Sequence, residues 1–218
     1  MYSSVCSSNI LSIDPTIDPA ILSMKIIALT GFMGCGKSSV GRRLSELLCS
    51  PYMDLDAVIE ERTGRSIPEI FASDGEAAFR QMELETLHNI LEEVGKQIIL
   101  SLGGGTVMTA ECAELVREKT LCIYLRTGVE TLVDRLSSET EGRPLLNPES
   151  HPEADDSNNS QKKSDTDLRT RIESLISGRA STYEATAHIT IDTDGLSVDD
   201  LAHSIQRKTS DYTSSSRS

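Results

Sequence analysis

The sequence predicts an α/β fold of three layers, in which helices cover both faces of a five-stranded parallel sheet. Short apolar segments of strand length alternate with longer segments whose apolar residues recur at helical spacing. Such alternation is typical of right-handed βαβ units. The chain has 218 residues, 38% of them hydrophobic, which is enough for one well-packed domain, expected over residues 24–208.

The five expected strands are short segments rich in apolar and β-branched residues. In chain order they are residues 26–29, 52–54, 97–102, 120–125 and 187–191. Strands of a parallel sheet covered by helices are buried on both faces, which favours continuous apolar runs over alternating ones. Bound ligands are expected at the carboxyl ends of such strands.

The expected helices are segments with apolar residues three and four positions apart. They cover residues 37–48, 76–94, 110–118, 129–135, 168–185 and 198–208. In the second of them, Leu87, Ile90, Leu91 and Val94 share one face. The last helix is expected to close the fold.

Three segments are not expected to pack into the domain. Residues 1–23 contain no Lys or Arg, which excludes a secretory signal or transit peptide. We expect a disordered leader there, with Met24 as an alternative start and a docked extension as the other interpretation. Residues 147–167 are rich in Asp, Glu, Ser, Asn and Pro, and residues 209–218 are rich in Ser, so we expect a mobile loop and a frayed tail.

Charge and cysteine content limit the partners and the compartment. The net charge of −13 argues against a nucleic acid or an anionic membrane surface, which such a chain would repel. No apolar run is long enough to cross a bilayer. Five cysteines form neither a C-x-x-C pair nor a zinc pattern, so a cytoplasmic protein with reduced thiols is expected.

One motif lies between the first expected strand and the first expected helix. The run Gly31-Phe32-Met33-Gly34-Cys35-Gly36-Lys37-Ser38 matches G-x-x-x-x-G-K-[ST] at every defined position, and its context argues against a chance Gly-rich turn. Backbone N–H groups and the helix N-terminus would face the phosphates of a nucleoside triphosphate, Lys37 would reach the outer phosphates, and Ser38 would offer a hydroxyl to Mg²⁺. The expected nucleotide contacts are Gly34, Cys35, Gly36, Lys37, Ser38 and Ser39.

Two further strand ends carry candidate site residues. Asp54 and Asp56 follow the second strand, where one carboxylate could order Mg²⁺ through water and the other could accept a proton from a substrate hydroxyl. The alternative is a solvated turn that caps a helix. Gly103, Gly104 and Gly105 follow the third strand, where a ligand could touch backbone N–H groups directly, although a flexible turn is the alternative.

Arg80, Arg143 and Arg179 are candidate anion ligands, because guanidinium groups bind carboxylates and phosphates in a bidentate manner. Taken singly, an arginine is more often a surface residue that forms a weak ion pair.

Taken together, these residues resemble the shikimate kinase family, small P-loop kinases related to the nucleoside monophosphate kinases. The resemblance covers about residues 25–208. It rests on the phosphate-loop run, Asp54-Leu55-Asp56, Thr63-Gly64-Arg65-Ser66-Ile67, Ile70-Phe71, Gly75-Glu76, Phe79-Arg80, Leu102-Gly103-Gly104-Gly105 and Arg143-Pro144-Leu145-Leu146.

The resemblance implies a P-loop kinase fold with a substrate subdomain over about residues 56–94 and a lid over about residues 137–179. It also implies transfer of the γ-phosphate of ATP to the 3-hydroxyl of shikimate, with Mg²⁺ as cofactor. Asp56 would activate that hydroxyl, Asp54 would order the water around Mg²⁺, and Arg143 would contact ATP and the transferring phosphate. The implied substrate contacts are Asp56, Arg80, Arg179 and Gly103, Gly104 and Gly105, with Glu83 supporting Arg80 and with Phe71 and Phe79 as apolar walls.

The chain also departs from the family pattern. The acidic stretch lengthens the lid, and we expect it to be a passive loop. Arg135 is the candidate on the adenine side, whereas Asp192-Thr193-Asp194 stands where the family often has a basic residue, so nucleotide preference stays open.

Two other functions remain alternatives to the expected monomeric shikimate kinase. One is a related kinase acting on a carboxylate-bearing polyol such as gluconate, although the glycine triplet and the Phe79-Arg80 pair favour shikimate. The other is a regulatory module that binds nucleotide without catalysis. The presence of Lys37, Asp54 and Asp56 argues against it.

Overall fold

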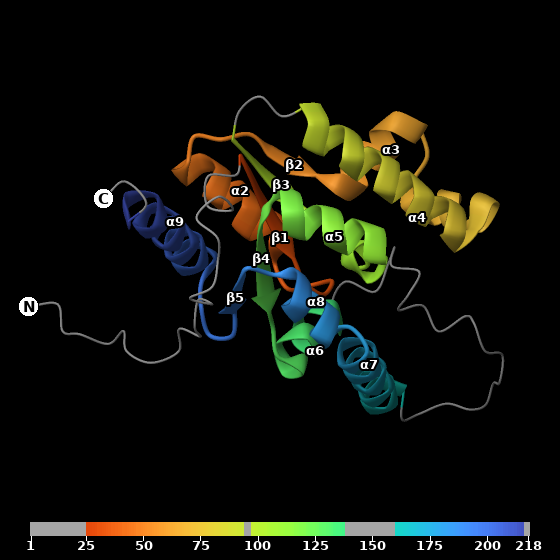
Figure 1. Cartoon of the computed structure of the whole chain (residues 1–218). Coiled ribbons are helices and arrows are strands. Elements are labelled where there is room, and N and C mark those ends of the chain that lie inside the picture. The colour runs from red at the N-terminus through yellow and green to blue at the C-terminus, as the bar shows by residue number, and fades with distance from the viewer. Residues whose placement is uncertain (1–24, 94–96, 138–159, 216–218) are drawn as a thin grey trace, which may run out of the picture.

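A computed structural model describes residues 25–93, 97–137 and 160–215, with only the backbone course for 160–167 and 210–215. Five strands form one parallel sheet in the order β2-β3-β1-β4-β5 (Figure 1). They are β1 (Ile26–Thr30), β2 (Tyr52–Asp54), β3 (Ile98–Ser101), β4 (Leu121–Arg126) and β5 (Ile189–Asp192). The predicted α/β class and the five-stranded parallel sheet are confirmed.

The central strand β1 brings two loops together. It pairs with β3 from Ile26 opposite Ile98 to Leu29 opposite Ser101, and the ladder continues as the Leu102 N–H donates to the Leu29 carbonyl at 3.0 Å. Both strands therefore end at the same level. The predicted phosphate loop after β1 and the glycine triplet after β3 consequently lie side by side.

The helices follow the predicted alternation. They are α2 (Lys37–Leu47), α3 (Leu55–Thr63), α4 (Ile67–Glu93), α5 (Ala110–Lys119), α6 (Val129–Ser137), α7 (Ser160–Ser177), α8 (Ala180–Thr186) and α9 (Val198–Ser215), with a 3₁₀ turn η1 (Thr106–Met108). Within the described residues, no helix is both long and apolar enough to cross a membrane.

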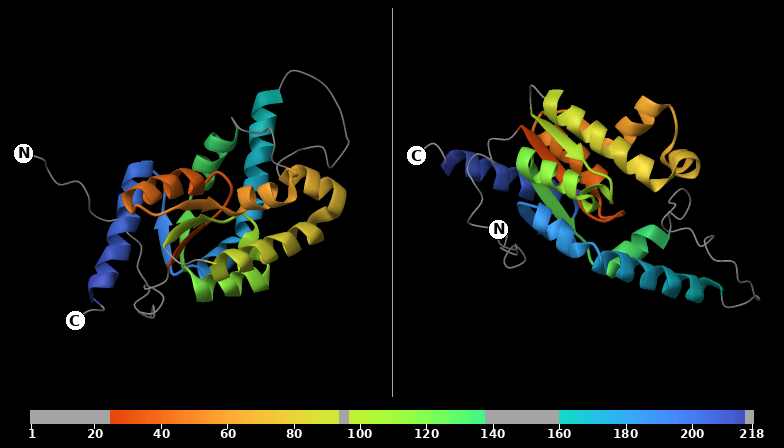
Figure 2. Two further views of the ribbon diagram at one scale, coloured as in Figure 1. Left: turned by 90° about the horizontal axis from the view of Figure 1, so that it is seen from above. Right: turned by 45° about the vertical axis from the view of Figure 1, so that its right-hand side comes forward.

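Two apolar layers sandwich the sheet, one on each face. Alternate residues of β1 point to opposite faces. Ile27 and Leu29 pack with side chains from α2, α6, α7 and α9, whereas Ile26 and Ala28 pack with side chains from α3, α4, α5 and α8. In the right-hand view of Figure 2, α3 and α4, in orange to yellow, lie together on one side of the molecule and α7, in teal, lies apart from them. The sheet is therefore covered on each face by its own apolar cluster.

Several helix boundaries differ from the predictions. The helix α3 was not predicted. It begins directly after β2, because the Asp54 side chain caps its first turn by accepting from the Asp56 N–H at 3.2 Å. Asp56 therefore lies in the first turn of a helix rather than at a strand tip. The predicted helix over residues 168–185 is divided into α7 and α8, which meet at Gly178 and Arg179.

The acidic segment and the C-terminal tail each contain helical residues that were expected to be irregular. The helix α7 begins at Ser160, inside the predicted mobile segment 147–167, where Gln161, Lys162 and Lys163 favour helix. The helix α9 continues to Ser215, into the predicted tail over residues 209–218. Residues 1–24 and 138–159, which include all of the predicted leader and most of the acidic segment, lie outside the described residues.

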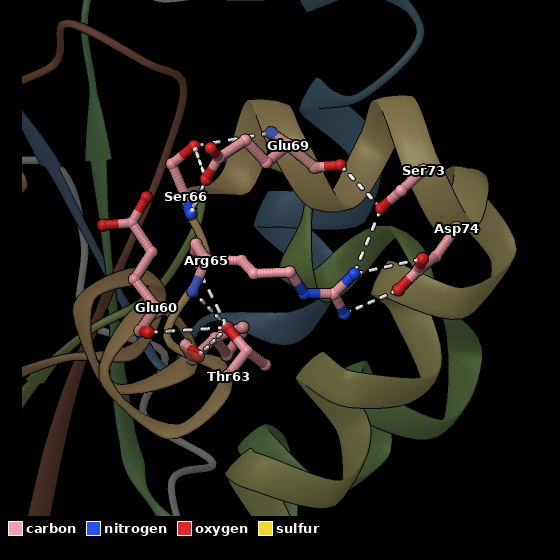
Figure 3. A network of polar contacts seen from close by, with 8 residues as sticks. Glu60, Thr63, Arg65, Ser66, Glu69, Ser73 and Asp74 are labelled. Carbon is pink, nitrogen blue, oxygen red and sulfur yellow. Dashed lines mark hydrogen bonds and ion pairs between the residues drawn. The ribbon is translucent and has the colours of Figure 1, made fainter.

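A bend divides α4, which begins at Ile67 rather than at the predicted residue 76. Gly75 has φ 82° and ψ 172°, a backbone conformation that is almost confined to glycine. Arg65, in the turn before α4, braces the segment that precedes the bend (Figure 3). Its guanidinium donates to both carboxylate oxygens of Asp74, at 3.1 and 2.6 Å, and to the Ser73 hydroxyl at 3.1 Å. The bend thus sets the direction of the longer segment that carries Arg80.

Candidate active site

A cavity of about 880 Å³ opens at the carboxyl ends of β1, β2 and β3. It gathers most of the residues predicted from the sequence, namely Gly34, Cys35, Gly36, Lys37, Ser38, Ser39, Asp54, Asp56, Arg80, Gly103, Gly104 and Gly105. Arg179 is not part of its lining. Arg143 lies outside the described residues.

The phosphate loop wraps around the side chain of Lys37. The Lys37 Nζ donates to the carbonyls of Gly31 and Phe32 at 2.8 and 3.1 Å. Gly36, which precedes α2, has φ 97°, and this left-handed conformation lets the chain turn directly into the helix. The loop therefore presents a lysine and the N-terminus of α2 to the cavity, an arrangement that suits a phosphate group.

Asp54 is held by three donors. Its Oδ2 accepts from the Tyr52 hydroxyl at 3.0 Å and from the Ser38 hydroxyl at 3.3 Å, while its Oδ1 accepts from the Asp56 N–H. The carboxylate is thus fixed beside the start of α2. A hydroxyl and a carboxylate from two different elements converge at this point.

Asp56 lines the same cavity, and its carboxyl group is hard to ionise. Burial is the main cause, and the negative charges of Glu83 and Asp54 add to it, whereas Lys37 acts in the opposite direction. Together they raise the pKa of Asp56 from 3.8 to about 6. A carboxylate with a pKa near neutrality, beside a phosphate loop, is suited to accept a proton.

Arg80 is anchored by carboxylates on its own helix. It forms ion pairs with Glu83 and with Glu76, the latter at 3.1 Å. Glu83 is fully buried, and its Oε1 accepts from the Thr106 hydroxyl at 2.6 Å. Burial alone would lower the pKa of Arg80, but the two glutamates outweigh it and raise the pKa. The guanidinium is therefore a fixed cation at the edge of the cavity.

The glycine triplet is required by what packs against it. A Cβ on Gly103 would lie 2.8 Å from the Asp56 carboxylate, and one on Gly105 would lie 2.7 Å from the Arg80 guanidinium. A Cβ on Gly104 would lie 3.3 Å from the backbone nitrogen of Met33 in the phosphate loop. The triplet thus lets the acid, the arginine and the phosphate loop approach one strand end together.

Arg179 occupies the junction between α7 and α8. Its Nη1 is buried and has no hydrogen-bond partner among the described residues, and its guanidinium carbon lies 6.0 Å from the centre of the Phe32 ring. An unpaired buried donor of this kind is costly unless it binds something. Phe71 and Phe79, predicted as apolar walls, both line the cavity and lie with their ring centres 4.8 Å apart.

Arg135, the candidate for the adenine side, is part of the cavity lining, whereas the segment Asp192-Thr193-Asp194 is not. Arg135 donates to the Gly34 carbonyl at 3.1 Å. Asp192 instead pairs with Arg126 at 2.6 Å, and Asp194 accepts from the Gly128 N–H at 3.0 Å.

Some residues of the site were missed by the sequence reasoning. Leu196 and Val198 line the cavity and remain 43% and 40% exposed, unusually high for large apolar side chains. Their position in a polar turn after the last strand could have identified them. Thr106 and Tyr52 carry no comparable sequence signal.

Known proteins resemble the chain over most of its length. Residues 33–210 match the family model described as shikimate kinase. A shikimate kinase of Chlorobium chlorochromatii is 40% identical over 186 residues, which cover 84% of this chain and 91% of that protein. A shikimate kinase of Thermus thermophilus is 39% identical over 183 residues, covering 84% and 88% respectively.

Solved structures share the fold. The shikimate kinase of Acinetobacter baumannii in complex with shikimate aligns with a TM-score of 0.72 at 32% identity, covering 86% of this chain and 94% of that chain. The shikimate kinase of Bacteroides thetaiotaomicron aligns with a TM-score of 0.71 at 28% identity, covering 85% and 98%. With the family match, the sequence identity and the three-layer architecture in agreement, we conclude that this chain belongs to the shikimate kinase family of P-loop kinases.

Proposed function

We propose that this chain transfers the γ-phosphate of ATP to the 3-hydroxyl of shikimate. The observation that carries the proposal is the meeting, in one cavity, of a phosphate loop, a carboxyl group with a pKa of about 6 and an anchored arginine. These are the parts that phosphoryl transfer to a carboxylate-bearing alcohol needs. Membership of the family supports the same reaction.

The phosphate loop holds the nucleotide in this mechanism. Backbone N–H groups from Gly34 to Ser39 face the phosphates, and Lys37 exchanges its loop carbonyls for phosphate oxygens. Arg143 is proposed, from the family resemblance, to contact the transferring phosphate. Because the reaction is driven by positioning and charge neutralisation, no covalent nucleophile of the protein is required.

Asp56 accepts the proton of the attacking hydroxyl. As that proton moves to the carboxylate, the 3-oxygen forms a bond to the γ-phosphorus and the bond to the bridging oxygen breaks, so ADP leaves. Its raised pKa makes Asp56 a stronger base than an ordinary aspartate. Its place in the first turn of α3 holds it beside Gly103.

Two arginines bind the substrate carboxylate. Arg80 is held in place by Glu83, and Arg179 has a buried Nη1 available for an anion. The glycine triplet provides backbone N–H groups for the ring hydroxyls, and Phe71 and Phe79 border the ring. A bidentate guanidinium pair would fix the ring so that its 3-hydroxyl faces Asp56.

The residues at the start of α2 fit Mg²⁺. The described residues contain no group of three or more His, Cys, Asp or Glu side chains that could hold a metal ion. Mg²⁺ in kinases needs few protein ligands, since phosphates and waters supply the rest. Ser38 would bind it directly and Asp54 would bind it through water, as their convergence allows. When bound, Mg²⁺ neutralises charge on the phosphates.

The decisive experiment compares acceptors. ADP release by the purified chain is measured with ATP and Mg²⁺ in the presence of shikimate, gluconate or nucleoside monophosphates, with Lys37→Met providing the background rate. Turnover with shikimate alone is expected. Turnover only with gluconate would keep the fold and reassign the substrate pocket, and nucleotide binding without any turnover would favour the regulatory module.

Two finer expectations remain predictions. We propose that the enzyme acts in the cytoplasm as a monomer, because residues of one chain line the cavity. Light scattering of the purified protein, with and without both substrates, tests its oligomeric state.

A further inference from the structure

The helix α8 connects Arg179 to the centre of the fold. Arg179 precedes its first residue, and Tyr183 follows one helical turn later. Tyr183 is fully buried, and its ring stacks on Tyr124 of β4 with the ring centres 5.1 Å apart. The buried ring of Tyr183 therefore fixes this short helix one turn after Arg179, the candidate ligand of the substrate carboxylate.

The hydroxyl of Tyr183 has a specific partner at the cavity. It donates a hydrogen bond to the carbonyl oxygen of Gly104, the central residue of the glycine triplet. Burial raises the pKa of Tyr183, and the nearby Arg179 only partly offsets this effect. The phenol thus stays protonated at physiological pH and remains a hydrogen-bond donor.

The carbonyl that accepts from Tyr183 belongs to a closely packed segment of backbone. Gly103 packs against Asp56, Gly105 packs against Arg80, and Gly104 packs against the phosphate loop. A shift of this strand end would move all three contacts. Arg179 itself lies near the Tyr183 hydroxyl, whose pKa its charge and a side-chain hydrogen bond lower, while its buried Nη1 lacks a hydrogen-bond partner among the described residues.

We propose that Tyr183 is a positioning residue for shikimate, which sets the separation between Arg179 and Arg80 by tying α8 to the Gly104 carbonyl. The proposal rests on the proposed function, since it assigns both arginines to one substrate carboxylate. Tyr183 touches neither substrate. It acts through the backbone of the triplet and through the start of α8.

The test removes only the hydroxyl. The variant Tyr183→Phe keeps the ring and its stacking, and Tyr124→Phe is the matched control because it removes the hydroxyl of the stacked partner. Dissociation constants for shikimate and for ATP are measured by calorimetry, together with kcat, both KM values and the melting temperature. We expect Tyr183→Phe to weaken shikimate binding about fivefold to tenfold, as loss of one buried hydrogen bond allows, with ATP binding and kcat within about twofold.

A second variant tests the link to Arg179. In an Arg179→Lys background, Tyr183→Phe is expected to weaken shikimate binding by less than about twofold, because the guanidinium that it positions is already gone. Equal losses in both backgrounds would overturn the proposal. Three other results would also overturn it: equal weakening of ATP binding and shikimate binding, the same loss from Tyr124→Phe, or a Tyr183→Phe variant that does not fold. Each would make the Tyr183 hydroxyl a purely structural group.

The wild-type measurements separate this inference from the proposed function. If the unaltered chain neither binds nor phosphorylates shikimate, the proposed function fails and the inference fails with it. If the unaltered chain does both and Tyr183→Phe binds shikimate equally well, only the inference is wrong.

Discussion

At the scale of single residues, the site depends on a few side chains whose neighbours change their chemistry. Asp56 and Asp54 are separated by one residue in the sequence, yet their environments differ. Asp54 accepts three hydrogen bonds, whereas Asp56 is partly buried near Glu83, and together burial and the charge of Glu83 raise its pKa to about 6. The two carboxylates are therefore suited to different roles, one beside a cation and one as a base.

The pKa of Asp56 predicts an acid limb in the pH profile. Because the ionised carboxylate is the base, kcat/KM for shikimate should fall about tenfold per pH unit below about pH 6. Removing the charge of Glu83 by Glu83→Gln should move this limb to lower pH. Initial rates between pH 4.5 and 8 provide the measurement. A limb near the ordinary aspartate pKa in the unaltered enzyme would contradict the assignment of Asp56 as a buried base.

The geometry of Arg80 predicts a specific effect on shikimate. Arg80→Lys keeps the charge but loses the planar guanidinium fork, so shikimate binding should weaken about tenfold, equivalent to about 1.4 kcal/mol, with ATP binding unchanged. Calorimetric titration of each substrate measures both. Arg65→Lys is the control, because Arg65 also pairs with a carboxylate but lies away from the cavity lining. Unchanged affinity for shikimate would remove Arg80 from the carboxylate site.

At the scale of elements, the bend in α4 decides where the substrate side of the cavity lies. Phe71 comes before Gly75 and Arg80 comes after it, and both line the cavity. In a continuous helix, Phe71 and Arg80 could not both face the cavity. The Arg65–Asp74 pair, although exposed and individually weak, holds the segment before the bend in its direction.

The bend predicts the result of Gly75→Ala. The conformation at Gly75 is nearly glycine-specific, so alanine should lower the free energy of unfolding by about 1–3 kcal/mol. It should also raise the KM for shikimate, as α4 straightens. The control is Gly64→Ala at the end of α3, where φ is 65° and a Cβ likewise meets nothing within 4 Å. That variant should lose stability without changing KM, and an equal KM change in both would assign the effect to general loosening.

At the scale of the whole molecule, an acidic protein carries a local cluster of cations in its cavity. The net charge is −13, whereas the cavity collects Lys37, Arg80 and Arg135. Asp56, the partly buried acid beside these cations, carries a cost in stability. A carboxyl group that is harder to ionise in the folded chain than in the unfolded chain destabilises the fold whenever it is charged.

The cost of Asp56 predicts that Asp56→Asn makes the fold more stable. The folded pKa is raised, so the penalty is fully present above about pH 6 and disappears as pH falls from about 6 toward 3.8. A shift of this size corresponds to at most about 3 kcal/mol at pH 7. Urea unfolding at pH 7 measures it. Asp74→Asn is the contrast, because Arg65 lowers the pKa of Asp74 and the variant should lose stability. A destabilised Asp56→Asn would contradict the account of burial given for the cavity.

Much of this arrangement could be predicted from the sequence, because it depends on local patterns. The strands, most helices and the phosphate loop follow from apolar periodicity and glycine spacing within short segments. The glycine triplet was placed correctly at a strand end. The reason why glycine is needed there could not be predicted, because the groups that pack against the triplet come from α3, α4 and the phosphate loop.

The sequence by itself determined the α/β class, the order of the elements and the position of the phosphate loop, since each is encoded in contiguous residues. Only the tertiary structure decided which distant groups meet. Two hydrogen bonds, Tyr183–Gly104 and Thr106–Glu83, join residues from separate elements. The raised pKa of Asp56 likewise depends on residues from other elements. Burial and charge at these points are properties of the packed molecule, because they depend on what surrounds a side chain in space rather than on its neighbours along the chain.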